Sequence, residues 1–321
     1  MIKKIYIDTD LGYDDLISIC LLFSSKKYQV RAISLVNGVS SINKGIENLI
    51  KILKYLKIKN ITLIKGKSKT IKDNWKAFFP LKDRQRANKL ELIKKLPLSY
   101  LNKKRVKIYP LKIYPSLLKT ETKKITLVCL GPLTNIAYLI KTYGKLFTDK
   151  VEQVYIMGGA IKTPGIVPPL NLVEYNIYLD PEAAKIVFNS SLPITLVPVD
   201  ATYDVPAMAA LAKKVEAKIL LKQLINKLQS QNFKSNVSLL IKEIILNNQY
   251  DFNRFYDPIV AGIMIKPKMI KKTLQGNITI ITKGKCRGQT KLINGISNKN
   301  INIIIKVKSN IFYKLLISLL N

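Results

Sequence analysis

The first 66 residues alternate short apolar runs with amphipathic segments, and this alternation limits the folds open to the chain. Residues 3–10, 29–38 and 60–66 are typical of strands, and helical patterns lie between them at 14–25 and 40–56. A strand–helix–strand succession is typical of a parallel sheet, because each helix returns the chain to the start of the next strand. We therefore expect an α/β protein with an open, mostly parallel, doubly wound (Rossmann-like) sheet flanked by helices.

The pattern is interrupted after residue 66 and then resumes. Residues 72–124 are basic, carry four prolines and show only short helical pieces, so we expect an insertion or lid beside the sheet. Strands are expected again at 123–131, 153–160, 192–200, 277–285, 289–293 and 300–308, and helices at 132–144, 180–190 and 310–320. Because neither a linker nor an internal repeat divides the sequence, we expect residues 1–321 to form a single large domain with additional C-terminal helices and strands.

The composition excludes several classes of site and partner. The chain has no histidine, and its three cysteines lie far apart, which excludes histidine-based catalysis and gives no zinc signature. A net charge of +34 comes mainly from lysine, with only six arginines, and fixed base or phosphate recognition favours arginine, so we expect no specific nucleic-acid partner. The first apolar run ends at Asp8, and residues 16–23 are too few to span a bilayer. We expect a cytoplasmic protein without a membrane partner.

The segment DTDLGYDD contains four of the chain's 20 acidic residues, namely Asp8, Asp10, Asp14 and Asp15. Like charges at this spacing repel one another, so a positive group is expected between them. The segment follows the first strand, and ligands of parallel sheets bind beyond the carboxyl ends of the strands. Oxygen ligands without histidine or a cysteine pair favour Ca²⁺ or Mg²⁺. Alternatively, Asp14 and Asp15 cap the next helix, which explains only two of the four acids.

Two further clusters combine acids or amides with apolar residues. In NLVEYNIYLDPEAA, Glu174 and Asn176 can project from one face of an extended segment, and a carboxylate beside an amide suits the recognition of sugar hydroxyls. In FYDPIVAGIM, Asp257 precedes a proline and an apolar helix, where it is either a helix cap or a further carboxylate of the metal site. These three residues are therefore candidates for substrate and metal binding.

In order along the chain, the motifs resemble those of the inosine-uridine preferring nucleoside hydrolase family. DTDLGYDD is similar to the family's DTDxGxDD signature, and LVCLGPLTNIA is similar to its LGPLTN segment. MGGA and EYNIYLDPEAA resemble its MGG…EFN…DPEAA block, and CRGQT resembles its late RGxT element. The resemblance covers nearly the whole chain. It implies Ca²⁺-dependent hydrolysis of the N-glycosidic bond of a ribonucleoside by a homo-oligomer, a dimer or a tetramer.

The resemblance also implies roles for individual residues. Ca²⁺ would be held by three carboxylates and one backbone carbonyl, from Asp10, Asp15, Asp257 and Leu130. Asp10 would in addition take a proton from the attacking water, and Asp8 would support the motif. The ribose would be bound by a second set of residues, namely Asp14, Asn37, Met157, Glu174 and Asn176.

Three departures from the family pattern concern the leaving base and the ribose contacts. Many members have a histidine directly before the late metal-binding aspartate, whereas this chain has Tyr256, a weaker acid toward the departing base at pH 7. The usual Gly-Asn at the end of the second strand reads Asn37-Gly38 here. The Gly-Asn upstream of the EFN block reads Gly165-Ile166, with Asn171 as a candidate substitute.

Two other interpretations remain open at this point. A nucleoside or ribose binder that keeps the metal site and has little or no turnover would explain the missing histidine and the altered asparagine positions. A phosphatase of the haloacid dehalogenase type also carries aspartates at a strand end. That family expects threonine or valine two residues after its second aspartate, where this chain has Gly12.

Overall fold

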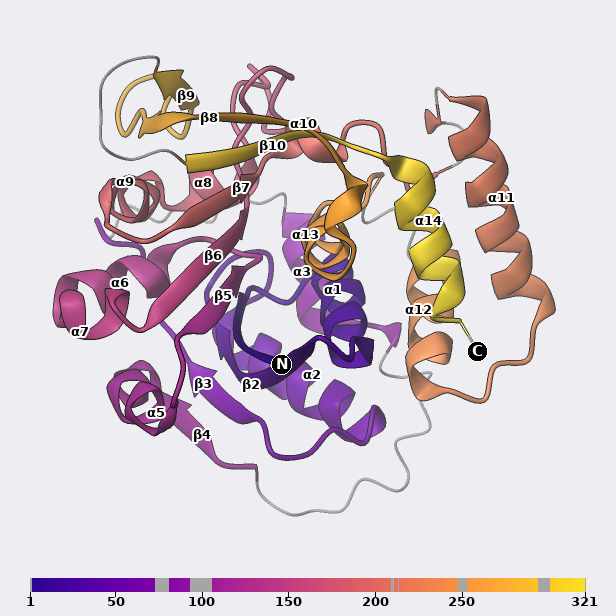
Figure 1. Ribbon diagram of the computed structural model, residues 1–321, viewed down its shortest axis with the longest axis horizontal. Helices are drawn as coiled ribbons and strands as arrows, with labels where there is room; N and C mark the ends of the chain where they lie inside the picture. Colours follow the sequence, from indigo (N-terminus) through magenta and orange to yellow (C-terminus); the bar gives the residue numbers. More distant parts are fainter. Residues whose placement is uncertain are drawn as a thin grey trace.

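One ten-stranded sheet runs through the computed structural model, which describes residues 2–72, 81–92, 106–208, 211–212, 214–247, 253–293 and 301–320. The strand order is β4-β3-β2-β1-β5-β6-β7-β10-β8-β9 (Figure 1). Neighbours from β4 to β10 are parallel, whereas β8 and β9 are added in antiparallel pairing. The strands are β1 (Lys3–Thr9), β2 (Tyr28–Leu35), β3 (Thr62–Lys65), β4 (Ile108–Pro110), β5 (Ile125–Cys129), β6 (Val151–Met157), β7 (Ile194–Val197), β8 (Ile270–Ile280), β9 (Thr290–Ile293) and β10 (Ile301–Val307).

The expected open, mostly parallel, doubly wound sheet is confirmed, and its centre is β1. This strand pairs with β2 on one side and with β5 on the other, so that Ile7 lies opposite both Ile33 and Val128. The chain therefore winds outward from β1 in two directions. Ligands of such sheets bind at the carboxyl ends of the strands where the winding reverses. Asp10 and Leu130 directly follow the two strands at this point.

Helices cover both faces of the sheet and bury two apolar cores. The first core includes α1, α2 and α11 to α14, and the second includes α5, α6, α7 and α9, on the left of Figure 1. The helices are α1 (Tyr13–Ser24), α2 (Ile42–Tyr55), α3 (Leu81–Lys89), η1 (Leu111–Ile113), α5 (Tyr114–Thr120), α6 (Thr134–Tyr143), α7 (Lys145–Thr148), α8 (Tyr175–Leu179), α9 (Pro181–Asn189), α10 (Val199–Thr202), α11 (Val215–Ser230), α12 (Asn236–Asn247), α13 (Asp257–Ile265), η3 (Pro267–Met269) and α14 (Ser309–Ser318). Among the described residues, no helix is both long and apolar enough to cross a bilayer.

Two central helices bring acidic residues to one place. α1 and α13 pack against each other, and every residue of α13 is buried, as its apolar sequence DPIVAGIMI requires. Pro258 lies in the first turn of α13, where a missing N–H breaks no intrahelical bond. Each helix has acids in its first turn, Asp14 and Asp15 in α1 and Asp257 in α13. The positive ends of both helix dipoles thus favour these carboxylates.

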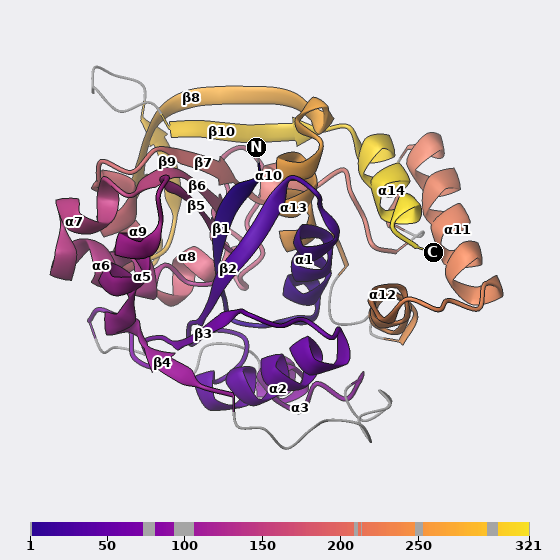
Figure 2. The same cartoon turned by 60° about the horizontal axis from the view of Figure 1, so that its bottom comes forward.

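The segment 72–124 contains more regular structure than its sequence indicates. β4 lies parallel to β3 and extends the sheet by one edge strand, which the sequence did not predict because it has only three residues and ends in Pro110. α3 packs beside α2, as Figure 2 shows. The expected lid falls partly on residues 73–80 and 93–105, which lie outside the described residues. β8 also begins earlier than expected, at Ile270.

Asn135 in α6 ties the ends of three neighbouring strands together. Its Nδ2 donates to Asp8 Oδ1 at 2.7 Å and to the carbonyl oxygen of Leu35 at 3.2 Å. Its Oδ1 accepts a hydrogen bond from the amide of Lys67 at 2.8 Å. Because Asn135 is fully buried, these groups have no access to water when the amide is removed. This network supports the strand ends from which the site is built.

We expect Asn135→Ala to lower the free energy of unfolding by about 2–3 kcal/mol, because buried polar groups lose their partners. Urea denaturation of the two proteins measures the difference. Asn189→Ala, at an exposed end of α9, is the matched control and should change it by less than about 0.5 kcal/mol. Equal unfolding free energies for wild type and Asn135→Ala would contradict this role.

Candidate active site

A cavity of about 520 Å³ opens at the carboxyl ends of β1, β5 and β6. Its lining also includes residues from the loop after β2, from α3 and from α8. The residues predicted from sequence that line it are Asp10, Asp14, Asp15, Leu130, Met157, Glu174, Asn176, Tyr256 and Asp257. The structure thus brings together residues that are separated by as much as three quarters of the chain. Asp8 and Asn37 are not among the lining residues.

The acids form a close group inside this cavity. Oxygen atoms of Asp14, Asp15 and Asp257 lie within 4.8 Å of one another, which is close enough to share a metal ion. Asp15 is held by the amide of Gly12 at 2.8 Å and by the hydroxyl of Thr9. Its bond to Gly12 is a helix-capping contact. The capping interpretation therefore explains one of the two bonds made by Asp15.

Burial and mutual repulsion make it costly to ionise these acids together. Burial and the charge of Asp15 raise the pKa of Asp14 to about 7, and burial raises the pKa of Asp15 to about 6. The pKa values of Asp10 and Asp257 are raised well above the ordinary range, first by burial and then by the neighbouring carboxylates. A hydrogen bond between Asp15 and Asp257 lowers the pKa of the former and raises that of the latter. Without a cation, protons must therefore neutralise part of this group.

A close approach between two strand ends explains the order Asn37-Gly38. A Cβ atom on Gly38 would lie 2.0 Å from Asp10 Oδ2, so only glycine fits beside this carboxylate. The amide of Asn37 is bonded elsewhere, since its Nδ2 donates to the carbonyl of Ser68 at 3.0 Å and its Oδ1 accepts from Arg84 at 2.8 Å. Asn37 thus holds the loop in place from outside the cavity.

Glu174 and Asn176 line the cavity, but the expectation of an extended segment is wrong. Glu174 is the N-cap of α8, and its carboxylate accepts hydrogen bonds from the amides of Gly159, Asn176 and Ile177 at 2.8–3.1 Å. Burial nevertheless raises its pKa to about 7. Asn176 Nδ2 donates to the carbonyl oxygens of Leu130 at 3.0 Å and Met157 at 3.3 Å. α8 therefore aligns two backbone carbonyls at the strand ends.

Asp8 lies in the framework behind the cavity. Its Oδ1 accepts from Asn135 and from the hydroxyl of Ser34, while its Oδ2 is buried without a hydrogen-bond partner among the described residues. Burial raises the pKa of this carboxyl to about 7. Asp8 lies within β1, whereas Asp10 follows the end of the strand and lines the cavity, so the two carboxylates are placed for different tasks.

Tyr256 lies at the wall of the cavity together with a residue that sequence reasoning missed. Its hydroxyl donates to Asn253 Oδ1 at 2.8 Å, and both residues line the cavity. Burial raises the pKa of Tyr256, so the phenol is neutral at physiological pH. In the sequence, only its position three residues before Tyr256 could have pointed to Asn253 as a site residue.

Further lining residues come from two segments whose role was not clear from sequence. Asp83 and Arg86 belong to α3, three residues apart, and reach the cavity from the basic segment 72–124. Tyr175 starts α8, and its pKa is raised by burial and by the nearby charge of Asp83. Asn171, the candidate substitute, also lines the cavity and has a positive φ of 50°, which asparagine tolerates better than most residues. These segments therefore add further polar residues to the lining of the cavity.

Several characterised proteins are similar to this chain. The pyrimidine-specific ribonucleoside hydrolase RihA of Salmonella enteritidis PT4 is 26% identical over 313 residues, which cover 89% of this chain and 86% of that protein. The solved structure of the inosine-uridine preferring nucleoside hydrolase of Bacillus anthracis matches with a TM-score of 0.80 at 21% identity and covers 99% of both chains. The purine-preferring ribonucleoside hydrolase of Gardnerella vaginalis matches with a TM-score of 0.75 at 20% identity, again over 99% of both chains. These structural matches show a shared fold.

The family assignment rests on the whole chain. The family model for inosine-uridine preferring nucleoside hydrolases matches residues 5–314, from β1 into α14. This range contains all the residues that line the cavity. The chain therefore belongs to the inosine-uridine preferring nucleoside hydrolase family and is an N-glycosyl hydrolase of ribonucleosides.

Proposed function

We propose that the cavity holds one Ca²⁺ ion, with Asp10, Asp15, Asp257 and the carbonyl of Leu130 as its ligands from this chain, the set that the family resemblance implies. Asp14 also lies close to Asp15 and Asp257, and we assign it to the ribose on the same ground. The observation that carries the proposal is a group of buried acids that cannot all ionise without a positive charge nearby. Carboxylate and carbonyl oxygens suit a hard cation such as Ca²⁺. The Leu130 carbonyl fits as well, because its oxygen has two lone pairs and Asn176 occupies only one.

When bound, Ca²⁺ supplies positive charge that keeps the carboxylates ionised and lowers the pKa of water. Asp10 accepts a proton from the water that attacks C1′ of the ribose. The N-glycosidic bond breaks, and its electron pair leaves with the base. Because the ribose gains positive charge in this step, nearby carboxylates stabilise the transition state. The products are ribose and the free base.

The ribose hydroxyls are assigned to Asp14, Glu174 and Asn176, with Met157 beside them. Three backbone amides hold the Glu174 carboxylate, and two carbonyls hold the Asn176 amide. Groups fixed in this way orient the sugar without losing further conformational freedom on binding. Asn37 does not belong to this set, because its amide has other partners.

The departing base is assigned to Tyr256. A neutral phenol can donate a hydrogen bond or a proton to the base nitrogen as the bond breaks. Asn253 accepts from this hydroxyl at 2.8 Å and so holds it at the cavity wall. Because the phenol has one proton, donation to the base replaces this bond. Tyr256 thereby takes the position at which many family members, by the sequence resemblance, have a histidine.

The first test is a panel of inosine, adenosine, uridine and cytidine, scored for free ribose in the presence of Ca²⁺. Wild type should release ribose from at least one of them, and Asp10→Asn should lower kcat by about 10²–10⁴-fold, as expected for loss of a general base. Asp149→Asn, at the exposed end of α7, is the control and should leave kcat unchanged. Release of no ribose from any nucleoside would contradict the proposal. Nucleoside binding by calorimetry in that case would identify a non-catalytic binder.

Tyr256→Phe tests assistance to the leaving base. We expect kcat to fall by about 10–100-fold with KM changed less than about threefold, because the hydroxyl acts mainly in the transition state. Steady-state kinetics on the best substrate of the panel measure both constants. Tyr143→Phe, at the end of α6, is the matched control. An unchanged kcat in Tyr256→Phe on every substrate would show that the phenol does not take part.

The raised pKa values predict how pH affects the metal-free protein. In the unfolded chain these carboxyls titrate near pH 4, but in the folded protein they titrate at about pH 6–7 for Asp8, Asp14, Asp15 and Glu174. Above about pH 4 the unfolded state therefore binds fewer protons, and stability falls as pH rises until the folded pKa values are passed. The chain has no histidine to obscure this trend.

Ca²⁺ should reverse the loss of stability, because it binds the ionised acids. The melting temperature of chelator-treated protein should be lower at about pH 7.5 than at about pH 5, and Ca²⁺ should raise it more at the higher pH. Circular dichroism melts at both pH values, with and without Ca²⁺, measure this. A Ca²⁺ effect that is absent, or equal at both pH values, argues against the site.

A further inference from the structure

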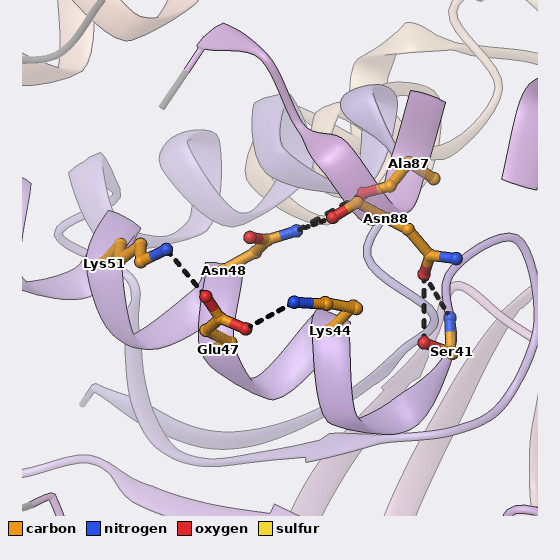
Figure 3. A network of polar contacts seen from close by, with 7 residues as sticks. All are labelled: Ser41, Lys44, Glu47, Asn48, Lys51, Ala87 and Asn88. Carbon is orange, nitrogen blue, oxygen red and sulfur yellow. Dashed lines mark hydrogen bonds and ion pairs between the residues drawn. The ribbon is translucent and has the colours of Figure 1, made fainter. Parts of the chain in front are cut away.

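Hydrogen bonds attach α3 to α2 and to Ser41, the residue directly before α2. Asn88 Oδ1 accepts from the amide of Ser41 at 2.8 Å and from its hydroxyl at 3.0 Å, and Asn48 Nδ2 donates to the carbonyls of Ala87 and Asn88 at 3.3 and 3.1 Å (Figure 3). Ser41 is the N-cap residue of α2, yet its hydroxyl makes no capping bond within that helix. The contact with α3 replaces the usual cap.

Arg84, one turn before Asn88 on α3, donates two hydrogen bonds to the loop after β2. Its NH1 donates to the carbonyl of Gly38 at 2.6 Å and its NH2 donates to Asn37 Oδ1 at 2.8 Å. The guanidinium is half-buried, and burial lowers the pKa of Arg84, although the nearby charge of Asp10 acts in the opposite direction. Two bonds from one planar group fix both the position and the orientation of the loop.

The same loop is hydrogen-bonded to both the side chain and the backbone of Asp10. The amide of Val39 donates to Asp10 Oδ2 at 2.7 Å, and the hydroxyl of Ser40 donates to the backbone carbonyl of Asp10 at 2.5 Å. Gly38 lies so close to the same carboxylate that no Cβ atom fits between them. Any shift of this loop must therefore move the Asp10 carboxylate or release one of its bonds.

We propose that Arg84 is a positioning residue, which fixes the loop from Asn37 to Val39 and thereby sets the orientation of the Asp10 carboxylate. The inference rests on the proposed function, in which Asp10 is both a metal ligand and the base. It also gives the segment 72–124 a role in the site, because α3 belongs to this segment and its Arg84 fixes the loop that bonds Asp10. Arg84 contacts no reacting atom itself. Its effect passes through the loop.

Lysine cannot replace arginine in this role. A single ammonium group can donate to Gly38 or to Asn37, but it lacks the planar fork that reaches both acceptors at fixed angles. We therefore expect a graded series in which Arg84→Lys lies between wild type and Arg84→Ala. Lys82→Ala is the matched control, because it removes one positive charge from an exposed position of the same helix.

The test combines three measurements on the full-length protein. Arg84→Ala should lower kcat for ribose release by about 10–100-fold with KM changed less than about threefold, as expected when a base is displaced by about 1 Å. Calorimetric titration should show Ca²⁺ binding weakened by about tenfold. Amide hydrogen exchange should show faster exchange at Val39, with Arg84→Lys intermediate in all three and Lys82→Ala equal to wild type.

Two results would overturn the proposal. One is unchanged exchange at Val39 together with unchanged Ca²⁺ affinity in Arg84→Ala. The other is the same losses in Lys82→Ala, which would point to charge rather than to the two bonds. If wild type releases no ribose at all, the proposed reaction fails, but the exchange and Ca²⁺ measurements still decide whether Arg84 orients Asp10.

Discussion

Repulsion among four carboxylates, three of them buried and one partly buried, is the constraint on which the rest of the site depends. Asp14, Asp15 and Asp257 meet where two helices begin, and Asp10 lines the same cavity from the end of β1. After burial, the charges of neighbouring carboxylates raise the pKa values of Asp10, Asp14 and Asp257. Helix dipoles and a few amides offset part of this cost, but such interactions are worth only about 1 kcal/mol each. A bound cation offsets far more. The sheet and its helices hold the acids in place despite this repulsion.

Three sets of hydrogen bonds support the acids. Asn135 joins the ends of β1, β2 and β3 behind the cavity, and Asn176 aligns the carbonyls at the ends of β5 and β6. The loop after β2 lies directly on Asp10, and Arg84 of α3 holds that loop. Each set is made of buried or half-buried hydrogen bonds rather than surface ion pairs. Such bonds position a group well, because leaving them unmade in the interior is costly.

Much of this arrangement could be predicted from the sequence, and the remainder depends on long-range contacts. The acids after β1 could be predicted because strand pattern and topology place them at the carboxyl edge, and family membership now leaves the phosphatase interpretation without support. Glu174 was expected in an extended segment, but its own carboxylate caps α8. The contacts of Arg84 and Asn88 with residues 46 and 47 positions earlier leave no local pattern, so α3 could not be placed. The order Asn37-Gly38, a puzzle in the sequence, is explained by a steric contact with Asp10.

The central claim is that Ca²⁺ takes the place of protons on the buried acids. Calorimetric titration of the metal-free protein with Ca²⁺ at about pH 6, repeated in two buffers of different ionisation enthalpy, counts the protons released for each ion bound. We predict one site per chain and release of about one proton or more, because burial and the neighbouring carboxylates raise the pKa values of Asp10 and Asp257 well above the ordinary range. Binding without proton release, or no binding, would contradict the account.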